Sequence, residues 1–234
     1  IFSGLMSMNP WKIFDTGAPT LRLEALQGGA LVLGGDDLAP AALLAATQIR
    51  PVSGERLLTA MAVGYELVAR LATAVHPASR RRGFHNTAIV GPLAAAGAVG
   101  TLFGMDAAMI EHALGIAASS ASGLFAFLHS GGDTKRLHAG HAAREGLLAA
   151  LLAEGGMQGP AGFVQAFGDA LVPRTGIDPQ APAAITQCYV KPWACCRHIH
   201  PAIDGLLDMM RNDGIDAANV ATIRAAMSAR LAAM

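Results

Sequence analysis

Residues 86–105 read NTAIVGPLAAAGAVGTLFGM and contain no Asp, Glu, Lys or Arg. The stretch is long enough for one helix, and its Gly91, Gly97 and Gly100 would let neighbouring helices approach closely. Gly104 stands where such a helix is expected to end. A second uncharged stretch follows at 112–132. We therefore predict a core of buried helices with closely spaced backbones.

Both uncharged stretches are also long enough to cross a membrane. Each is diluted by Gly, Ala, Ser, His or Pro, so the favourable free energy of membrane insertion summed along it would be small. Buried helices of a soluble protein fit this composition better. We expect no membrane partner.

The overall composition points to a folded protein with no electrostatic preference for anionic polymers. Among 234 residues, 53% are hydrophobic and 15% charged, and 17 basic residues balance 17 acidic ones. This balance argues against a nucleic-acid partner. The three cysteines, of which Cys195 and Cys196 are adjacent, do not form the paired framework of small secreted domains. No signal-peptide pattern opens the sequence, and we expect a cytoplasmic protein.

Apolar periodicity and breaker residues place the remaining elements. Ser53 and Asp106 are expected to cap helices, and residues 80–85 and 130–133 are expected to form loops. The predicted helices cover 21–33, 39–49, 54–75, 87–103, 107–123, 134–154 and 201–211, and a short strand is predicted at 185–190. Residues 220–227 fit a strand or a helix, with a slight preference for the strand.

These elements predict a mainly α fold with two parts. A large all-helical domain covers 1–180, and part of a smaller domain that mixes strand and helix, an α+β lid, covers 181–234. The change in composition around 178–184 marks the boundary between them.

Three motifs occur in a fixed order along the chain. Gly83-Phe84-His85 opens a small-residue helix, DTKRLHAG at 133–140 opens the long helix, and KPWACCRHIHPAID occupies 191–204. Together they resemble the MmgE/PrpD family. The resemblance covers about residues 39–216, and three motifs with plausible spacing make it specific.

The resemblance implies a helical domain that mediates a homodimer, a lid domain, and an active site between them that needs no cofactor. The family acts on small di- or tricarboxylates by breaking a bond at a carbon next to a carboxylate. We expect a carbon–oxygen lyase most like 2-methylcitrate dehydratase. An epimerase or a decarboxylase of the family, or a catalytically inactive dimerising helical scaffold, remain alternatives.

Such chemistry needs fixed cations where negative charge develops. Of the 17 basic residues, 14 are arginine, which leaves Lys12, Lys135 and Lys191. Lys135 stands at a predicted helix N-terminus, where free backbone N–H groups also favour anions. The family motifs place Lys135 and Lys191 at active-site lysines. The alternatives are an ordinary helix-end charge for Lys135 and an edge-strand charge for Lys191.

His85 is the candidate general base, because imidazole titrates near neutral pH and a helix N-terminus favours its neutral form. A capping or loop histidine is the alternative. His138 lies three positions after Lys135 and shares its helix face, so we assign it to substrate binding. Arg82, in the basic run 80–82, is a further substrate-binding candidate, although a solvated basic loop is the simpler interpretation.

The family carries an Asp-Asp-x-His type motif before a helix that begins Pro-Ala-Ala-Leu. Here Gly35-Asp36-Asp37-Leu38 stands before that helix, and all histidines lie at His76 or later. We assign Asp37 to catalysis and Asp36 to substrate binding as the remnant of this motif. The departure leaves the early histidine without a counterpart.

The cluster of Cys195, Cys196, His198 and His200 invites comparison with a zinc site. A tetrahedral zinc site draws paired ligands from two separated segments, and no second CxxC or HxxxH pair is present. We therefore predict no metal and no cofactor.

Overall fold

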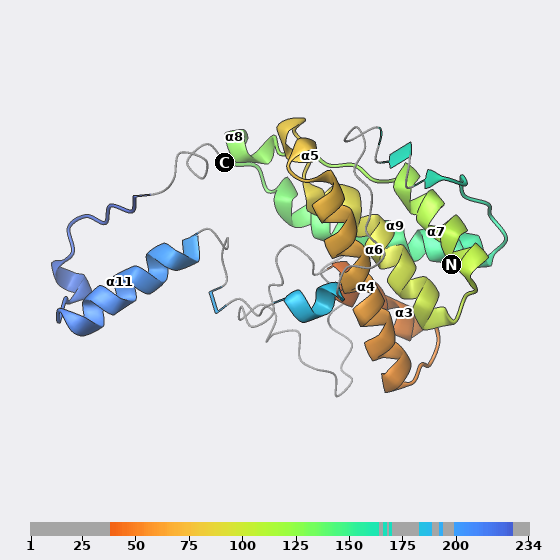
Figure 1. Ribbon diagram of the computed structural model, residues 1–234, viewed down its shortest axis with the longest axis horizontal. Coiled ribbons are helices and arrows are strands. Elements are labelled where there is room, and N and C mark those ends of the chain that lie inside the picture. Colours follow the sequence, from red (N-terminus) through yellow and green to blue (C-terminus); the bar gives the residue numbers. More distant parts are fainter. Residues whose placement is uncertain are drawn as a thin grey trace. The chain divides into compact units, whose positions relative to one another are not determined.

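The computed structural model of the protein describes residues 38–163, 166–167, 169, 183–188, 192–193 and 199–226 (Figure 1). The described residues fall into two compact units, one that ends at residue 188 and one that begins at residue 192. The predicted helix at 21–33 lies outside the described residues, as does most of the predicted boundary region, so that boundary stays a prediction.

The first unit is helical throughout its described length. Its elements are α3 (Leu38–Ile49), α4 (Gly54–Val75), α5 (Ala78–Arg81), α6 (Asn86–Phe103), α7 (Ala107–Ser119), α8 (Phe127–Ser130), α9 (Thr134–Glu154) and the 3-10 helix η1 (Ala184–Gln187). The second unit has α11 (His200–Asn212) and the 3-10 helix η3 (Ala217–Asn219). Within the described residues there is no strand, only an isolated bridge between Phe84 and Leu124. The predicted mainly α fold is confirmed, and the lid stays a prediction.

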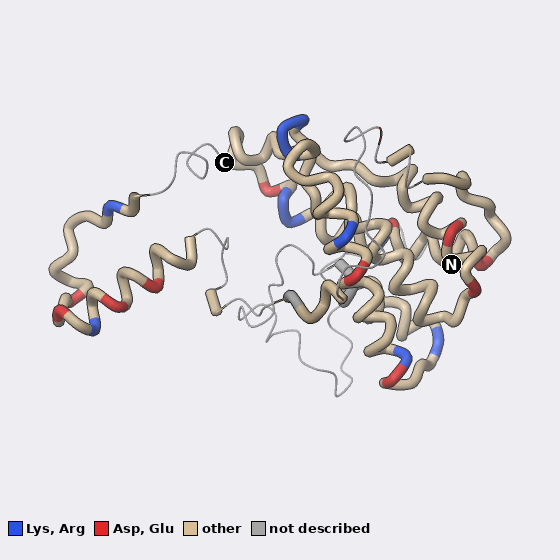
Figure 2. The backbone as a smooth tube through the Cα atoms, in the orientation of Figure 1, with Lys and Arg blue, Asp and Glu red and all other residues tan. Residues whose placement is uncertain are grey.

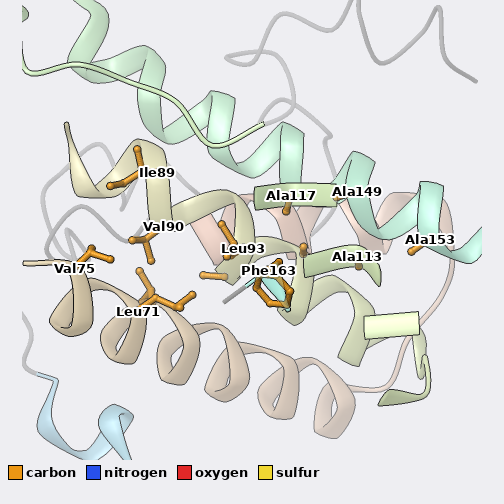
Figure 3. Close-up of a cluster of buried hydrophobic side chains, with 13 residues drawn as sticks. Leu71, Val75, Ile89, Val90, Leu93, Ala113, Ala117, Ala149, Ala153 and Phe163 are labelled. Atoms are coloured by element: carbon orange, nitrogen blue, oxygen red, sulfur yellow. The ribbon is translucent and has the colours of Figure 1, made fainter. Parts of the chain in front are cut away.

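Helix α6 is the centre of the first unit. It contacts α3, α4, α7 and α9, which surround it in Figure 1. Nearly all of its side chains are buried, including Pro92 in its interior. Figure 3 shows one of the two core clusters, which includes Leu93 of α6, Leu71 of α4 and Phe163. The uncharged stretch of the sequence therefore forms the most buried helix of this unit, with partly exposed residues only near its two ends.

The helix ends follow the capping residues that the sequence predicts. The Ser53 Oγ accepts a hydrogen bond from the Arg56 backbone N–H at 3.2 Å, and the Asp106 Oδ1 accepts one from the Met109 N–H at 2.8 Å. Gly104 ends α6 in the left-handed conformation, with φ of 72°. These caps satisfy backbone groups that would otherwise lack partners at the helix ends.

Small residues set the spacing between α6 and α9. A Cβ atom at Gly146 of α9 would collide with the Cβ of Ala95 and would lie 2.7 Å from the carbonyl oxygen of Pro92. Only glycine fits at this approach, because any larger side chain would push the two helices apart. The predicted close packing of helices is present at this crossing.

The predicted strand at 185–190 is wrong where the structure describes it. Residues 184–187 form η1, in which the Cys188 backbone N–H bonds to the carbonyl of Ile185. The Ala184 N–H bonds to the Glu66 carboxylate of α4 at 2.6 Å. This bond, joined by the Glu66–Arg70 ion pair, lowers the pKa of Glu66. The N-terminus of η1 thus docks on α4, and no other described segment offers it a strand to pair with.

Three further expectations about local structure were inaccurate. Residues 220–226 are neither strand nor helix, and they follow the short η3, which the Asp216 side chain caps. Part of the predicted loop at 80–85 belongs to α5. The helix expected to extend to about Gly123 ends at Ser119.

Two described helices, α4 and α6, are long and apolar enough to cross a membrane by length and composition alone. In α6, 78% of the relevant window is buried inside the protein, as is usual for a core helix. In α4 the corresponding share is 33%.

Candidate active site

The candidate site begins where two loops are tied together in front of α6. The backbone N–H of His85 donates to the Gly123 carbonyl at 3.0 Å, and the N–H of Phe125 donates to the Gly83 carbonyl at 2.8 Å. These bonds flank the bridge between Phe84 and Leu124. His85 directly precedes α6, with no capping bond from its own side chain. The imidazole is therefore left available for other contacts.

The His85 side chain meets His138, which projects from the second turn of α9. Their Nδ1 atoms lie 2.9 Å apart, a hydrogen-bond distance. His138 is only 8% exposed. The rings of Phe125 and Phe127 lie edge-on to His85, with centroids at 4.8 and 5.4 Å. The histidine pair is therefore held by aromatic packing as well as by its own hydrogen bond.

Gly123 allows the loop to lie against this pair. A Cβ atom at Gly123 would collide with the Cβ of Ala88 and would lie 3.2 Å from the Nε2 of His138. Its φ of 155° is also one that residues with a side chain rarely adopt. The glycine thus permits the close approach that brings Phe125 and Phe127 over His85.

Both imidazoles are held in their neutral form. Burial lowers the pKa of His85 most, followed by electrostatic repulsion from His138, Lys135 and Arg80 in that order, and together they bring it to about 4. Burial, followed by His141, also lowers the pKa of His138. The sequence predicted a neutral His85 because of the helix field. The structure attributes this state to desolvation first and to neighbouring cations second.

Lys135 stands in the first turn of α9, one turn before His138, and its side chain is exposed. It is close enough to lower the pKa of His85. The Asp133 side chain does not cap this helix, and its carboxylate lies 3.6 Å from Arg136 instead. Figure 2 shows the basic segments of α5 and of the start of α9 at the same end of the helical unit. A helix N-terminus and an ammonium group there both favour an anion.

Arg80 is the cation of the basic run that reaches the site. Its guanidinium lies 4.5 Å from the centre of the Phe125 ring, and its charge acts on His85. Arg82, which the sequence assigned to substrate binding, is exposed and is not among the groups that act on His85. Sequence reasoning singled out Arg82 from the run 80–82 instead of Arg80, and it missed the two phenylalanines. The Phe125-x-Phe127 spacing after Gly123 was the signal available for the aromatic contacts.

The other predicted site residues lie outside the described part of the chain. Lys191, Asp36 and Asp37 belong to this group, as do Cys195, Cys196 and His198 of the cysteine–histidine cluster. Among the described residues, no group of three or more His, Cys, Asp or Glu side chains is arranged to hold a metal ion. His200, the first residue of α11, is 2% exposed and belongs to the second unit.

Chemically, the described residues combine a proton acceptor with positive charge. Two fixed cations act on the pKa of His85, and no carboxylate among the described residues does so. A neutral imidazole beside two cations suits an anionic substrate, because the anion offsets the like-charge repulsion and can exchange a proton with the ring.

Comparison with known proteins shows which family has this arrangement of motifs. The family model described as the MmgE/PrpD N-terminal domain matches residues 34–171. A cis-aconitate decarboxylase of Aspergillus terreus is 32% identical over 197 residues, which cover 76% of this chain and 40% of the relative. A cis-aconitate decarboxylase-like protein of Aspergillus oryzae is 35% identical over 177 residues, 69% of this chain and 36% of its own length.

The human cis-aconitate decarboxylase is 38% identical over 108 residues, which cover 46% of this chain and 22% of the human protein. The chain thus spans about two fifths or less of the length of these relatives. The match to the family model covers more than half of the chain and includes His85, Lys135 and His138. This chain belongs to the MmgE/PrpD family.

Proposed function

We propose that the protein is a lyase that needs no cofactor and decarboxylates a small tricarboxylate resembling cis-aconitate. The observation that carries the proposal is the neutral His85–His138 pair, with its Nδ1 atoms 2.9 Å apart, beside the charges of Lys135 and Arg80. The Aspergillus terreus and human relatives are cis-aconitate decarboxylases, which favours loss of carbon dioxide over loss of water.

The chemistry requires that negative charge be stabilised while one proton is delivered. The bond between a carbon atom and its carboxylate breaks, and carbon dioxide leaves. The electron pair of that bond stays on the carbon atom of the substrate, beside the carboxylate that remains on the double bond. That carbon then takes one proton, so a trianion and a proton give a dianion and carbon dioxide. Lys135 and Arg80 would meet the substrate carboxylates, and His85 would supply the proton.

A depressed histidine pKa is compatible with this role. The free site holds His85 neutral at physiological pH, because its pKa is about 4. A bound trianion adds negative charge beside the ring and raises the pKa of His85. Substrate binding would therefore charge the imidazole with the proton that the reaction needs.

Lys191, Asp36 and Asp37 would complete the site, Lys191 as a further cation and the aspartates as orienting or proton-donating groups. A homodimer in the cytoplasm is part of the same proposal. Dehydration of 2-methylcitrate and epimerisation remain possible outcomes, since each also forms negative charge next to a carboxylate.

The test is turnover by the full-length protein on a panel of cis-aconitate, 2-methylcitrate and aspartate-derived dicarboxylates. Proton NMR of the mixture identifies the product, and carbon dioxide release separates decarboxylation from the other reactions. We expect release from cis-aconitate, and a loss of at least about 100-fold in His85→Gln and Lys135→Met. Arg136→Gln, which changes the exposed neighbour of Lys135, should keep its activity.

Water loss from 2-methylcitrate without carbon dioxide release would replace the decarboxylase by a dehydratase. No turnover, together with no change in thermal stability on addition of any of these anions, would favour the inactive helical scaffold.

A further inference from the structure

We propose that His138 is a positioning residue that accepts a hydrogen bond from the Nδ1–H of His85 and so keeps the Nε2 of His85 as the atom that exchanges protons. This deepens the proposed function and rests on it for its catalytic consequence. The hydrogen-bond direction itself can be measured without any turnover.

The chemistry of the imidazole ring limits the tautomers that the two histidines can adopt. A neutral histidine carries one N–H and one lone pair, on different nitrogens. The two Nδ1 atoms are 2.9 Å apart, so one must carry the hydrogen and the other the lone pair. The pair therefore consists of opposite tautomers: one ring presents a lone pair at Nε2, and the other presents an Nε2–H.

The protonated state of His85 decides which histidine donates the hydrogen bond. If His85 donates, its Nε2 carries the lone pair, and adding a proton there leaves the Nδ1–H bond to His138 in place. If His138 donated, protonating His85 would require two N–H groups to face each other across 2.9 Å. Only the first direction survives both protonation states of His85. Proton transfer at Nε2 then needs no rearrangement of the pair, which keeps the ring preorganised.

The His138 ring is held in place by its neighbours. Its ring is 8% exposed and lies edge-on to Phe127, with centroids 5.7 Å apart. Its Nε2 lies under Gly123. The only charged or titratable groups that act on the pair within the described residues are Lys135, Arg80 and His141. Packing therefore fixes this ring more strongly than charge does.

Of the two remaining ring nitrogens, only the Nε2 of His85 is left for substrate, because Gly123 covers the Nε2 of His138. Within the described part of the chain, the Nε2 atoms of His85 and His138 make no hydrogen bond to another residue. The Nε2 of His85 can therefore face substrate, while His138 acts only through His85. The proposal therefore gives His138 a positioning role in place of the substrate-binding role that the sequence predicted.

The experiment reads the tautomers directly. Histidines labelled with ¹⁵N give different nitrogen shifts for protonated and unprotonated ring positions. In the full-length protein at pH 7.5, we expect His85 protonated at Nδ1 and His138 at Nε2. Assignments come from single substitutions of each histidine.

Two variants separate positioning from packing. His138→Leu removes the acceptor, whereas His138→Asn places an amide oxygen close to the position of Nδ1. We expect the leucine variant to give a mixture of His85 tautomers and to lose about 100-fold or more in kcat with KM changed less than about threefold. The asparagine variant should restore the tautomer and at least about tenfold of the rate. His129→Asn, at an exposed histidine of α8 that does not act on the pair, is the matched control.

A wild-type His85 protonated at Nε2, or a His138→Leu variant whose His85 keeps the Nδ1–H tautomer alone, would overturn the proposal. The wild-type measurement decides the direction even if the leucine variant does not fold. If the tautomers are as expected but no carboxylate is turned over, the hydrogen-bond assignment stands and the proposed function fails.

Discussion

The Nδ1 atoms of His85 and His138 lie 2.9 Å apart although 53 positions separate the two residues in sequence. One histidine precedes α6 and the other belongs to α9, and these helices share the largest interface between described elements. The alignment of the pair therefore depends on how two core helices cross.

The low pKa of His85 predicts that stability falls in mild acid. The folded-state pKa is about 4, and the unfolded value is 6.5. Between these values the unfolded chain binds more protons than the folded protein. The contribution of His85 to the free energy of unfolding is therefore fully present above pH 6.5 and is lost as the pH falls towards 4. After allowance for partial exposure, we expect about 1–3 kcal/mol. Urea unfolding at several pH values measures it.

The variant His85→Asn cannot take up this proton, so its free energy of unfolding should depend less steeply on pH in the same window. Parallel pH dependences in the two proteins would show that His85 is not the buried titrating group.

Gly123 predicts a test of the loop that covers the pair. In Gly123→Ala the added methyl group would collide with Ala88 and press on the His138 Nε2, which lies 3.2 Å from the new atom. We expect a loss of about 1–3 kcal/mol in unfolding free energy and an altered His85 nitrogen shift. Gly132→Ala is the control, because its nearest neighbour is the Ser130 Oγ at 3.4 Å. Equal effects of both substitutions would argue against the close approach at Gly123.

The contact between α6 and α9 predicts a larger effect deep in the core. Gly146→Ala places a methyl group against Ala95 and 2.7 Å from the Pro92 carbonyl, so we expect at least about 1–3 kcal/mol of destabilisation. At Gly54, the first residue of α4, a Cβ meets no atom within 4 Å. Gly54→Ala should therefore be neutral or stabilise by up to about 1 kcal/mol. Thermal unfolding ranks the two, and a harmless Gly146→Ala would contradict the described helix spacing.

Arg80 and Arg81 predict different effects on anion binding, although they are neighbours on α5. Arg80 acts on His85, whereas Arg81 is exposed and does not. Calorimetric titration with citrate should show about tenfold weaker binding in Arg80→Gln, as expected for loss of a charge-assisted hydrogen bond. Arg81→Gln should change the affinity less than twofold. Similar losses in both would mean that the run acts only by its overall charge.

Local signals were sufficient to predict most of the first unit. Ser53, Gly104 and Asp106 act through bonds to residues three or four positions away, so their effect is visible in a short window of sequence. The errors arose where tertiary contacts decide. Residues 184–187 fit a strand by composition, yet a carboxylate on α4 fixes them as a 3-10 turn.

The site shows the same distinction. His85 and Lys135 were found through motifs, but no local pattern reveals that His138 turns towards His85 and away from solvent. Likewise, three successive arginines look alike in sequence, and only the position of Phe125 distinguishes Arg80 from Arg82. Pairing across 53 positions requires the helix crossing itself, which the sequence predicted only as a tendency towards close packing.

The glycine contact at Gly146 has a consequence for how this protein can diverge. Because a missing methyl group sets the separation of α6 and α9, the reach between the two imidazoles is dictated from the interior and not by the surrounding turns. The loops near the histidine pair could then change in sequence to accept acids of different shape, while His85 and His138 keep their alignment. A substitution at the contact between α6 and α9 would instead change the distance between the two imidazoles without changing any residue that contacts substrate.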